Sequence, residues 1–496
     1  MLTDNKEVDI LTETIKETVS LNESSFNWIA LITICLGALM VVIDETIVNV
    51  ALPSIKISLG FSDTNLAWIV NAYLISFGGF LLLTGRIGDL YGNKKLFLFG
   101  IAGFTFFSLT SGLATSQSIL LLSRIGQGIT GAVISAISLS LIVSTYRDAK
   151  SMAKAMGLFS AALAGGGSIG VFLGGLITSY FGWHWIFFIN LPTGIVVFFL
   201  VSKLVQESKN KSQDNRKLDV WGALTVTLSS LLVVYGIVNG NEIGWFTFQT
   251  FVTIFIGILL FIIFVFIEYR SKYPLIPLGL LKIKNLVVAN AIAILWAAAM
   301  FALFFLSTLY LQQVLELSPI EVGLTFLPTN LSMALLSILV SEKLVNKYGV
   351  LKTVSSGIFL NFVGMLLLAR TPINGQVLID VMPAMLLFGI GSGIAFNPLL
   401  LAAMNGIDEE DSGLASSLVN MSFVMGGALG LAILSSTADL ITKNSLASGF
   451  SLKFALNSGY NFAFFIASIL ILISVILCLL YLNIDLNEKN VSETNN

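Results

Sequence analysis

The chain has 496 residues, of which 56% are hydrophobic and only 11% charged, whereas soluble domains carry roughly a quarter charged residues. This composition indicates a polytopic membrane protein rather than a soluble domain. The formal net charge of -2 gives no reason to expect a nucleic acid partner.

Apolar runs of about 17–25 residues, the length that crosses roughly 30 Å of hydrocarbon, recur along the whole chain. They predict about fourteen membrane-spanning helices and an all-α fold. In chain order the expected spans are 28–53, 66–84, 96–114, 119–146, 156–180, 185–205, 220–238, 248–267, 286–312, 320–342, 350–369, 381–404, 413–440 and 460–482.

Polar segments divide this series of helices. The expected parts are a cytoplasmic tail (1–27), six helices (28–205), a linker (206–219), two additional helices with the following loop (220–285), six helices (286–482) and a second cytoplasmic tail (483–496). With an even number of helices, most of the 26 basic residues fall on the side of both termini. The positive-inside rule therefore predicts that both termini lie in the cytosol.

Residues 85–92 and 342–349 each follow an expected span and end in Tyr-Gly. Repeated halves are common in secondary transporters. The match therefore predicts an internal repeat, in which Asn346 stands where the first copy has Asp89.

The first span carries two adjacent acids, Asp44 and Glu45. An ionisable side chain near the middle of a bilayer costs about 2.5–3.5 kcal/mol on insertion scales, so such residues usually mark a substrate or ion pathway. Consecutive helical residues diverge by roughly 100° and cannot both face one narrow line. We expect one acid to serve the site and the other its rim, with Asp44 as the carboxylate that binds the proton or substrate and Glu45 as its helper.

Four segments carry a family resemblance. Residues 85–95 (GRIGDLYGNKK) resemble motif A of the major facilitator superfamily, 124–132 (RIGQGITGA) its motif B, and 166–175 (GGSIGVFLGG) the antiporter motif C. Residues 43–53 (IDETIVNVALP) are similar to the first-helix signature of the fourteen-helix drug:proton antiporters. The resemblance implies two six-helix bundles with two central helices between them, and proton-coupled export of lipophilic, cationic drugs across the plasma membrane by alternating access.

In that family the arginine of motif B is associated with proton coupling. Arg124 would then bias the protonation of Asp44 or Glu45, with Thr46 and Asn49 as supporting residues of the first helix. The alternative is a structural anchor, because a long cationic side chain near a helix end can reach the membrane interface.

Motif A implies a conformational latch between the halves. Its members would be Gly85, Asp89, Gly92, Lys94, Lys95 and Arg147. The alternative is an ordinary basic cytoplasmic loop.

The motif C glycines, Gly166, Gly170, Gly174 and Gly175, are spaced so that another helix can approach closely. Close packing alone is the alternative to a role in antiport. Val171 stands where the motif usually has proline, which removes the ground for expecting a kink. His184, just beyond, is either a pH-sensitive group or, as we favour, part of an interfacial aromatic belt.

Other residues give weaker indications. A single histidine and two cysteines in apolar runs argue against a metal site and a disulfide framework, and no Walker loop is present, so ATP is not expected. Protons are the expected coupling ion and no cofactor is expected; the partners would be lipophilic substrates and membrane lipids. Phe301, Phe304 and Phe305 are candidates for lining an apolar substrate cavity.

Two alternatives to drug export stay open. The first is export of an endogenous metabolite, lipid precursor or siderophore. The second, from a different class, is a membrane sensor that has kept the fold without transport. An enzyme is not expected, because no nucleophile, base and orienting group occur at recognisable spacing.

Overall fold

The computed structural model describes residues 28–146, 149–205, 219–271, 274–276, 279–407 and 412–482, and these ranges are helical apart from short connections. A helix satisfies its backbone hydrogen bonds within one segment, which is what a hydrocarbon environment without water requires. Tails 1–27 and 483–496 and most of linker 206–219 lie outside the described residues.

The helices fall into three consecutive groups. The first contains α2 (Trp28–Leu59), α3 (Asp63–Leu66), α4 (Trp68–Tyr91), α5 (Asn93–Gly112), α6 (Gln117–Thr145), α7 (Ala149–Phe181), α8 (Trp185–Phe188) and α9 (Asn190–Leu204). The second contains α10 (Val220–Ile243) and α11 (Phe248–Arg270). The third contains the 3-10 turn η1 (Leu280–Lys282), α12 (Lys284–Leu309), the π-helical η2 (Tyr310–Val314), α13 (Pro319–Leu339), α14 (Ser341–Tyr348), α15 (Val350–Leu368), the π-helical η3 (Val377–Val381), α16 (Met382–Met404), α17 (Ser412–Ala447) and α18 (Leu452–Tyr481).

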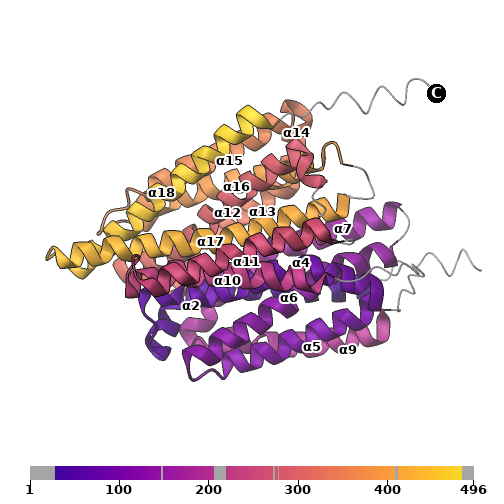
Figure 1. Ribbon diagram of the computed structural model, residues 1–496, viewed down its shortest axis with the longest axis horizontal. Coiled ribbons are helices and arrows are strands. Elements are labelled where there is room, and N and C mark those ends of the chain that lie inside the picture. The colour runs from indigo at the N-terminus through magenta and orange to yellow at the C-terminus, as the bar shows by residue number, and fades with distance from the viewer. Residues whose placement is uncertain are drawn as a thin grey trace, which may run out of the picture.

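Within the described residues, 13 helices are long and apolar enough to cross a membrane, and the shorter apolar helix Trp68–Thr84 adds one more. The number and order of spans predicted from the sequence are therefore confirmed. The largest difference from the expected spans concerns α17 and α18. Helix α17 continues past 440 to Ala447, and α18 begins before 460, at Leu452. They form a hairpin that projects past the other helices (Figure 1), because their helical structure extends into polar sequence beyond the apolar runs.

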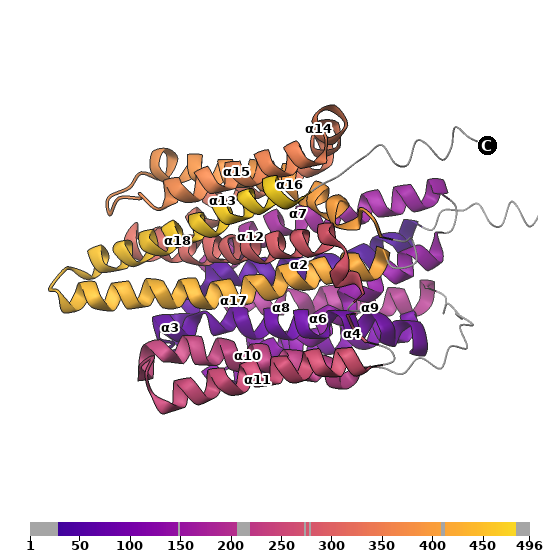
Figure 2. The same cartoon turned by 45° about the horizontal axis from the view of Figure 1, so that its top comes forward.

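The first and third groups form two bundles that lie side by side (Figures 1 and 2). Helix α10 packs against α4 of the first bundle and α17 of the second, and α11 packs on α10. We call the end of the molecule where α2 begins and α18 ends the terminal face, and the other end the opposite face.

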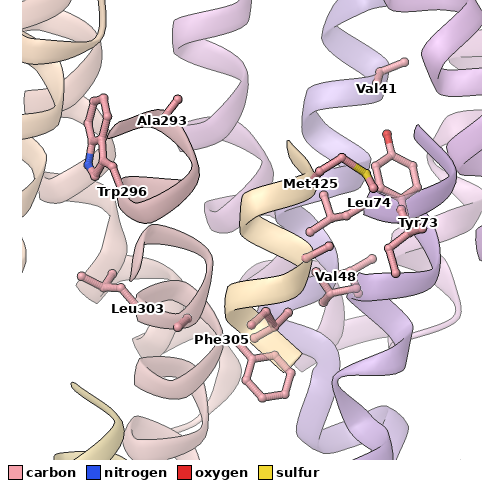
Figure 3. Close-up of a cluster of buried hydrophobic side chains, with 14 of the residues drawn as sticks. Val41, Val48, Tyr73, Leu74, Ala293, Trp296, Leu303, Phe305 and Met425 are labelled. Carbon is pink, nitrogen blue, oxygen red and sulfur yellow. The ribbon is translucent and has the colours of Figure 1, made fainter. Parts of the chain in front are cut away.

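Buried apolar side chains join the two bundles. In Figure 3, Met425 of α17 points toward Leu74 and Tyr73 of α4, with Val48 of α2 nearby. Gly78 of α4 allows this approach, because a Cβ at that position would lie 2.8 Å from the Met425 sulfur. The contact between α4 and α17 at this point therefore depends on the absence of a side chain at Gly78.

The two Tyr-Gly segments adopt the same turn. Gly92 ends α4 and precedes α5 with φ 98°, and Gly349 ends α14 and precedes α15 with φ 84°. Residues with a side chain rarely adopt a positive φ, whereas glycine does so readily. The predicted repeat is confirmed at these two turns.

Candidate functional site

Asp44 and Glu45 lie near the middle of α2 in different surroundings. Asp44 has 0% exposed surface, whereas Glu45 is only partly buried. Val41, Val48 and Ala51 share the buried helix face with Asp44, since residues three or four apart lie on one side of a helix. The two carboxyl groups therefore face different environments.

The Asp44 carboxylate accepts hydrogen bonds from three side chains. Arg124 of α6 donates from Nη1 to Oδ2 and forms an ion pair with it. Gln127 of α6 and Asn190 of α9 both donate to Oδ1, each at 2.9 Å. All four side chains are at most 2% exposed, so three helices meet around one buried negative charge.

Two serines of α5 hold the amide groups in place. Ser108 Oγ accepts from Gln127 Nε2 at 2.8 Å and from Asn190 Nδ2 at 3.2 Å. Ser111 Oγ donates to Gln127 Oε1 at 3.1 Å. Because every member is buried, the network stabilises the site only while all its partners are present.

Arg124 is also held from the other side. Its Nε donates to the Ile69 carbonyl of α4 at 3.2 Å, and its Cζ lies 4.3 Å from the centre of the Tyr73 ring. With 1% exposure, the guanidinium does not reach the membrane interface, so the anchor interpretation is wrong. Removing one partner of such a buried pair typically costs about 3–5 kcal/mol.

Glu45 has a different environment. It interacts electrostatically with Arg124 and with Asp44, but its carboxylate accepts no hydrogen bond and forms no ion pair with any residue in the described ranges. It is the one charged side chain of this cluster that is neither fully buried nor paired.

Thr46 and Asn49 do not contact the carboxylates. Thr46 Oγ1 donates to the Val42 carbonyl at 2.9 Å, and Asn49 Nδ2 donates to the Glu45 carbonyl at 3.4 Å. Both side chains therefore bond to the backbone of α2 and are partly exposed, and Asn49, four residues on, lies on the same side of the helix as Glu45.

The motif C glycines of α7 lie against two neighbouring helices. A Cβ at Gly166 would meet Leu39 and Val42 of α2, and one at Gly174 would lie 2.6 Å from the Ile47 carbonyl oxygen. Gly170 also faces α2. Gly175 faces α13 of the second bundle, where a Cβ would lie 2.5 Å from the Pro319 carbonyl oxygen. The predicted close approach of another helix is confirmed, and α7 continues through Val171 as an α-helix.

Motif A is described only in part. Gly92 makes the left-handed turn between α4 and α5. Lys94 Nζ donates to the Ser202 carbonyl of α9 at 2.7 Å, which is a contact within the first bundle, and Lys95 is exposed. The side chain of Asp89, the surroundings of Gly85 and the whole of Arg147 lie outside what the structure describes. The latch therefore stays a prediction.

Hydrogen bonds cross between the bundles near the opposite face. Gln312, in the π-helical turn η2, donates to the Val50 carbonyl of α2 at 2.8 Å. The amide of Ile320 in α13 donates to Ser179 Oγ of α7 at 3.1 Å. Together with the Gly175–Pro319 approach, these contacts hold α2 to η2 and α7 to α13.

Sequence reasoning missed several of these residues. The sequence patterns do not single out Ser108, Ser111, Asn190 or Gln312, and Gln127 enters only as part of motif B. A usable signal was present, since Ser108 and Ser111 lie three residues apart in an apolar run, as do Arg124 and Gln127, and residues at that spacing share a helix face.

The phenylalanine candidates have separate surroundings. Phe305 lines a cavity of about 20 Å³ together with Asp439, Thr442 and Tyr460. That volume accommodates about one water molecule, so it is not a drug-sized cavity. Phe301 and Phe304 are partly exposed, and their rings lie 6.1 Å from Phe423 and 5.4 Å from Phe326, respectively.

Comparisons with known proteins agree with this architecture. Residues 34–431 match the family model described as Major Facilitator Superfamily. The puromycin resistance protein pur8 of Streptomyces alboniger is 33% identical over 85% of this chain and 83% of its own length. The cephamycin export protein CmcT of Amycolatopsis lactamdurans is 31% identical over 82% and 84%.

The fold is shared with more distant transporters. The crystal structure of an auto-inhibited POT family peptide transporter superimposes with a TM-score of 0.68 at 14% sequence identity, covering 92% of this chain and 98% of that one. The resemblance seen in the four sequence motifs is thereby confirmed. This chain belongs to the Major Facilitator Superfamily and is a multi-pass membrane transporter, not an enzyme.

Proposed function

We propose that the protein exports lipophilic, cationic compounds across the plasma membrane in exchange for protons, by alternating access between its two bundles. The observation that carries this proposal is the buried Asp44–Arg124 ion pair with the Glu45 carboxyl beside it in the middle of α2. Ionisable groups at that depth are costly and usually mark an ion or substrate pathway. Relatives named for puromycin resistance and cephamycin export support the export of antibiotic-like compounds.

We place the terminal face in the cytosol and the opposite face outside. Lysines gather at or near the helix ends of the terminal face, as the positive-inside rule requires of a cytoplasmic side; those described are Lys94, Lys95, Lys154, Lys203, Lys282, Lys284, Lys343, Lys347 and Lys352. The contacts of Gln312 and Gly175 between the bundles then close the outer side, so the structure corresponds to the half of the cycle in which the outer side is shut.

In the cycle, a cation enters from the cytosol and meets a deprotonated carboxylate of α2. The bundles then rock, the outer contacts open, and protonation of the acid from outside releases the cation. Each proton that enters across 100 mV contributes about 2.3 kcal/mol from the potential alone. The potential drives export only where more positive charge enters with the protons than leaves with the substrate; exchange of one proton for one monovalent cation is electroneutral and is driven by the pH gradient alone.

Motif A is the proposed latch of this cycle. Gly92 allows the sharp turn after α4, and Lys94 ties that turn to α9. Asp89 would then present its charge toward the basic segment that contains Arg147, so that opening and closing depend on the pair.

The test is efflux of ethidium from proteoliposomes under an imposed proton gradient, with Asp44→Asn and Glu45→Gln beside the unchanged protein. Both variants should lose gradient-driven efflux. A matched control is Glu316→Gln, because Glu316 is an exposed acid whose ion pair with Lys453 at 2.9 Å lies far from α2 in the sequence. The proposal fails if the unchanged protein moves no ethidium or if the double variant moves it equally well.

Export of an endogenous metabolite is the second candidate. The similarity to a protein named for cephamycin export, rather than for resistance, favours it. Efflux measured with anionic and neutral metabolites in the same proteoliposomes separates the two: metabolite efflux without any ethidium efflux would favour the metabolite.

A further inference from the structure

We propose that Glu45 is the carboxyl group that exchanges protons for cationic substrate, while Asp44 stays ionised throughout the cycle as the fixed counter-ion of Arg124. This inference rests on the proposed function and assigns separate roles to its two acids. It reverses the sequence-based expectation that Asp44 is the principal exchange group and Glu45 its helper.

The hydrogen bonds of Asp44 favour a permanent charge. Arg124, Gln127 and Asn190 all donate to its two oxygens, and none of these donor groups can accept a proton at neutral pH. A proton added to Asp44 would weaken these bonds, because hydrogen bonds to a charged acceptor are stronger than those to a neutral one. It would also leave the buried guanidinium without its counter-charge, which is strongly unfavourable in a medium of low polarity.

The access to Asp44 is equally restrictive. The carboxylate has 0% exposed surface, and its partners Arg124, Gln127 and Asn190 are at most 2% exposed. A cation that replaced Arg124 would have to enter a packed network that also includes Ser108. The site therefore has no open side toward a substrate.

Glu45 meets the opposite conditions. It is partly exposed, as are Val42 and Asn49, which lie three and four residues away along α2. The next residue, Thr46, lies near the second bundle: a Cβ on Gly167 of α7 would lie 4.0 Å from Thr46 Cγ2 and 3.8 Å from Asn330 Oδ1 of α13. Glu45 is therefore carried by the turn of α2 that reaches the boundary between the bundles, where alternating access requires the exchange group.

The charge balance gives the same assignment. Asp44 and Arg124 together are neutral, so an ionised Glu45 leaves one net negative charge inside the membrane, and such a charge is costly there. Either a proton or a monovalent cation removes that charge. One carboxyl group beside a neutral ion pair is therefore sufficient for exchange of the two.

Few other charged or titratable groups face Glu45. Arg124 of α6 attracts it and Asp44 repels it, and the Tyr73 hydroxyl of α4 also interacts with it. Elsewhere on the helices that pack against α2, the titratable residues of the described parts lie toward the helix ends; they are Lys154 and Tyr180 of α7, Lys203 of α9, Lys284 of α12, Tyr310 of η2 and Glu321 of α13.

The proposed step is a simple proton exchange. When the cation arrives from the cytosol, the O–H bond of Glu45 breaks and its proton passes to water on that side. The carboxylate keeps the electron pair and balances the cation. On the outer side, water delivers a proton to the same oxygen and the cation leaves, so each turnover carries the proton inward.

Infrared difference spectroscopy on the purified full-length protein tests this directly. Addition of ethidium should remove the carbonyl band of a protonated carboxylic acid. In protein grown with ¹³C-labelled glutamate that band should shift to lower frequency, and in protein grown with ¹³C-labelled aspartate it should not. A band that shifts only with labelled aspartate would overturn the inference.

Two variants sharpen the result. Glu45→Gln should lose the band and the proton release that accompanies ethidium binding, whereas Glu45→Asp should keep both, with the band now sensitive to labelled aspartate. Persistence of the band in Glu45→Gln would contradict the proposal. Transport measurements distinguish failure of the proposed function from failure of the assignment to Glu45. Unchanged protein that moves no ethidium refutes the proposed function. Protein that transports ethidium but whose carbonyl band shifts only with labelled aspartate refutes only the assignment to Glu45.

Discussion

Gly170 of α7 lies directly against the hydroxyl group of Thr46 on α2. A Cβ at Gly170 would overlap the Thr46 oxygen and lie 2.9 Å from the Ile43 carbonyl oxygen. The Thr46 hydroxyl in turn donates to the Val42 carbonyl at 2.9 Å. The antiporter-like glycine thus fits against the same turn of α2 that carries Asp44 and Glu45, and the packing of α7 sets the position of the acids.

We therefore expect Gly170→Ala to destabilise the protein by about 1–3 kcal/mol, the usual cost of adding a methyl group to a packed interface. Thermal unfolding can be followed with a thiol-reactive dye, because Cys35 and Cys478 are both buried. Gly165→Ala is the matched control, since a Cβ at Gly165 meets nothing within 4 Å outside its own helix. Equal melting temperatures for the two variants would show that the α2–α7 contact is not tight.

Asp44 and Arg124 should depend on each other for stability. Asp44→Asn leaves a buried guanidinium without a counter-charge, and we expect a loss of about 3–5 kcal/mol. The double variant with Arg124→Gln should lose less than the sum of the two single changes, because the second change removes the unpaired charge. The same dye measurement on all four proteins gives the coupling, and strict additivity would contradict the ion pair.

The sequence predicted the fold better than it predicted the contacts of the site. Helix number and order follow from apolar runs, because a spanning segment must be both long and apolar. The ends of α17 and α18 were misjudged, since Lys443, Asn444 and Lys453 are polar yet helical, and hydropathy does not report a helix that continues beyond the membrane.

The partners of Asp44 could be predicted only in part. Arg124 was expected to act on the acids because the arginine of motif B is associated with proton coupling in the family that the sequence resembles. Asn190 and Ser108 were not, because their contacts join residues 146 and 82 positions apart. Such contacts depend on how helices rotate and pack, which the composition of any one helix does not determine. The different burial of Asp44 and Glu45 also depends on how α2 is rotated against its neighbours.

Gln312 should stabilise the closed state of the opposite face, which we propose to be the outer side. Its bond to Val50 crosses between the bundles, and losing one hydrogen bond of about 1 kcal/mol changes the ratio of closed to open molecules about fivefold. We expect Gln312→Ala to increase the open population. Spin labels at Ile57 of α2 and Leu378 of η3, which are 84% and 75% exposed, would report this as a larger share of long distances.

The neighbouring glutamine provides the control for this measurement. Gln313 Oε1 accepts from the Tyr460 hydroxyl of α18 at 2.9 Å, which is a contact within the second bundle. Gln313→Ala should therefore leave the distance distribution close to that of the unchanged protein. A similar shift in both variants would attribute the effect to damage of η2 rather than to the bond between bundles.

His184 should be neutral at pH 7. Burial lowers the pKa of its imidazole below the ordinary 6.5, and its ring stacks on Trp183 with 3.8 Å between centroids. Since the unfolded chain then binds the proton more tightly, the contribution of His184 to stability is full above pH 6.5 and decreases as the pH falls from there toward the folded-state pKa. As the chain has one histidine, NMR of ¹⁵N-histidine protein in micelles follows this titration without assignment. Trp183→Leu removes the stacked ring and should move the pKa back toward 6.5, whereas a pKa at or above 6.5 in the unchanged protein would show that the imidazole is not desolvated.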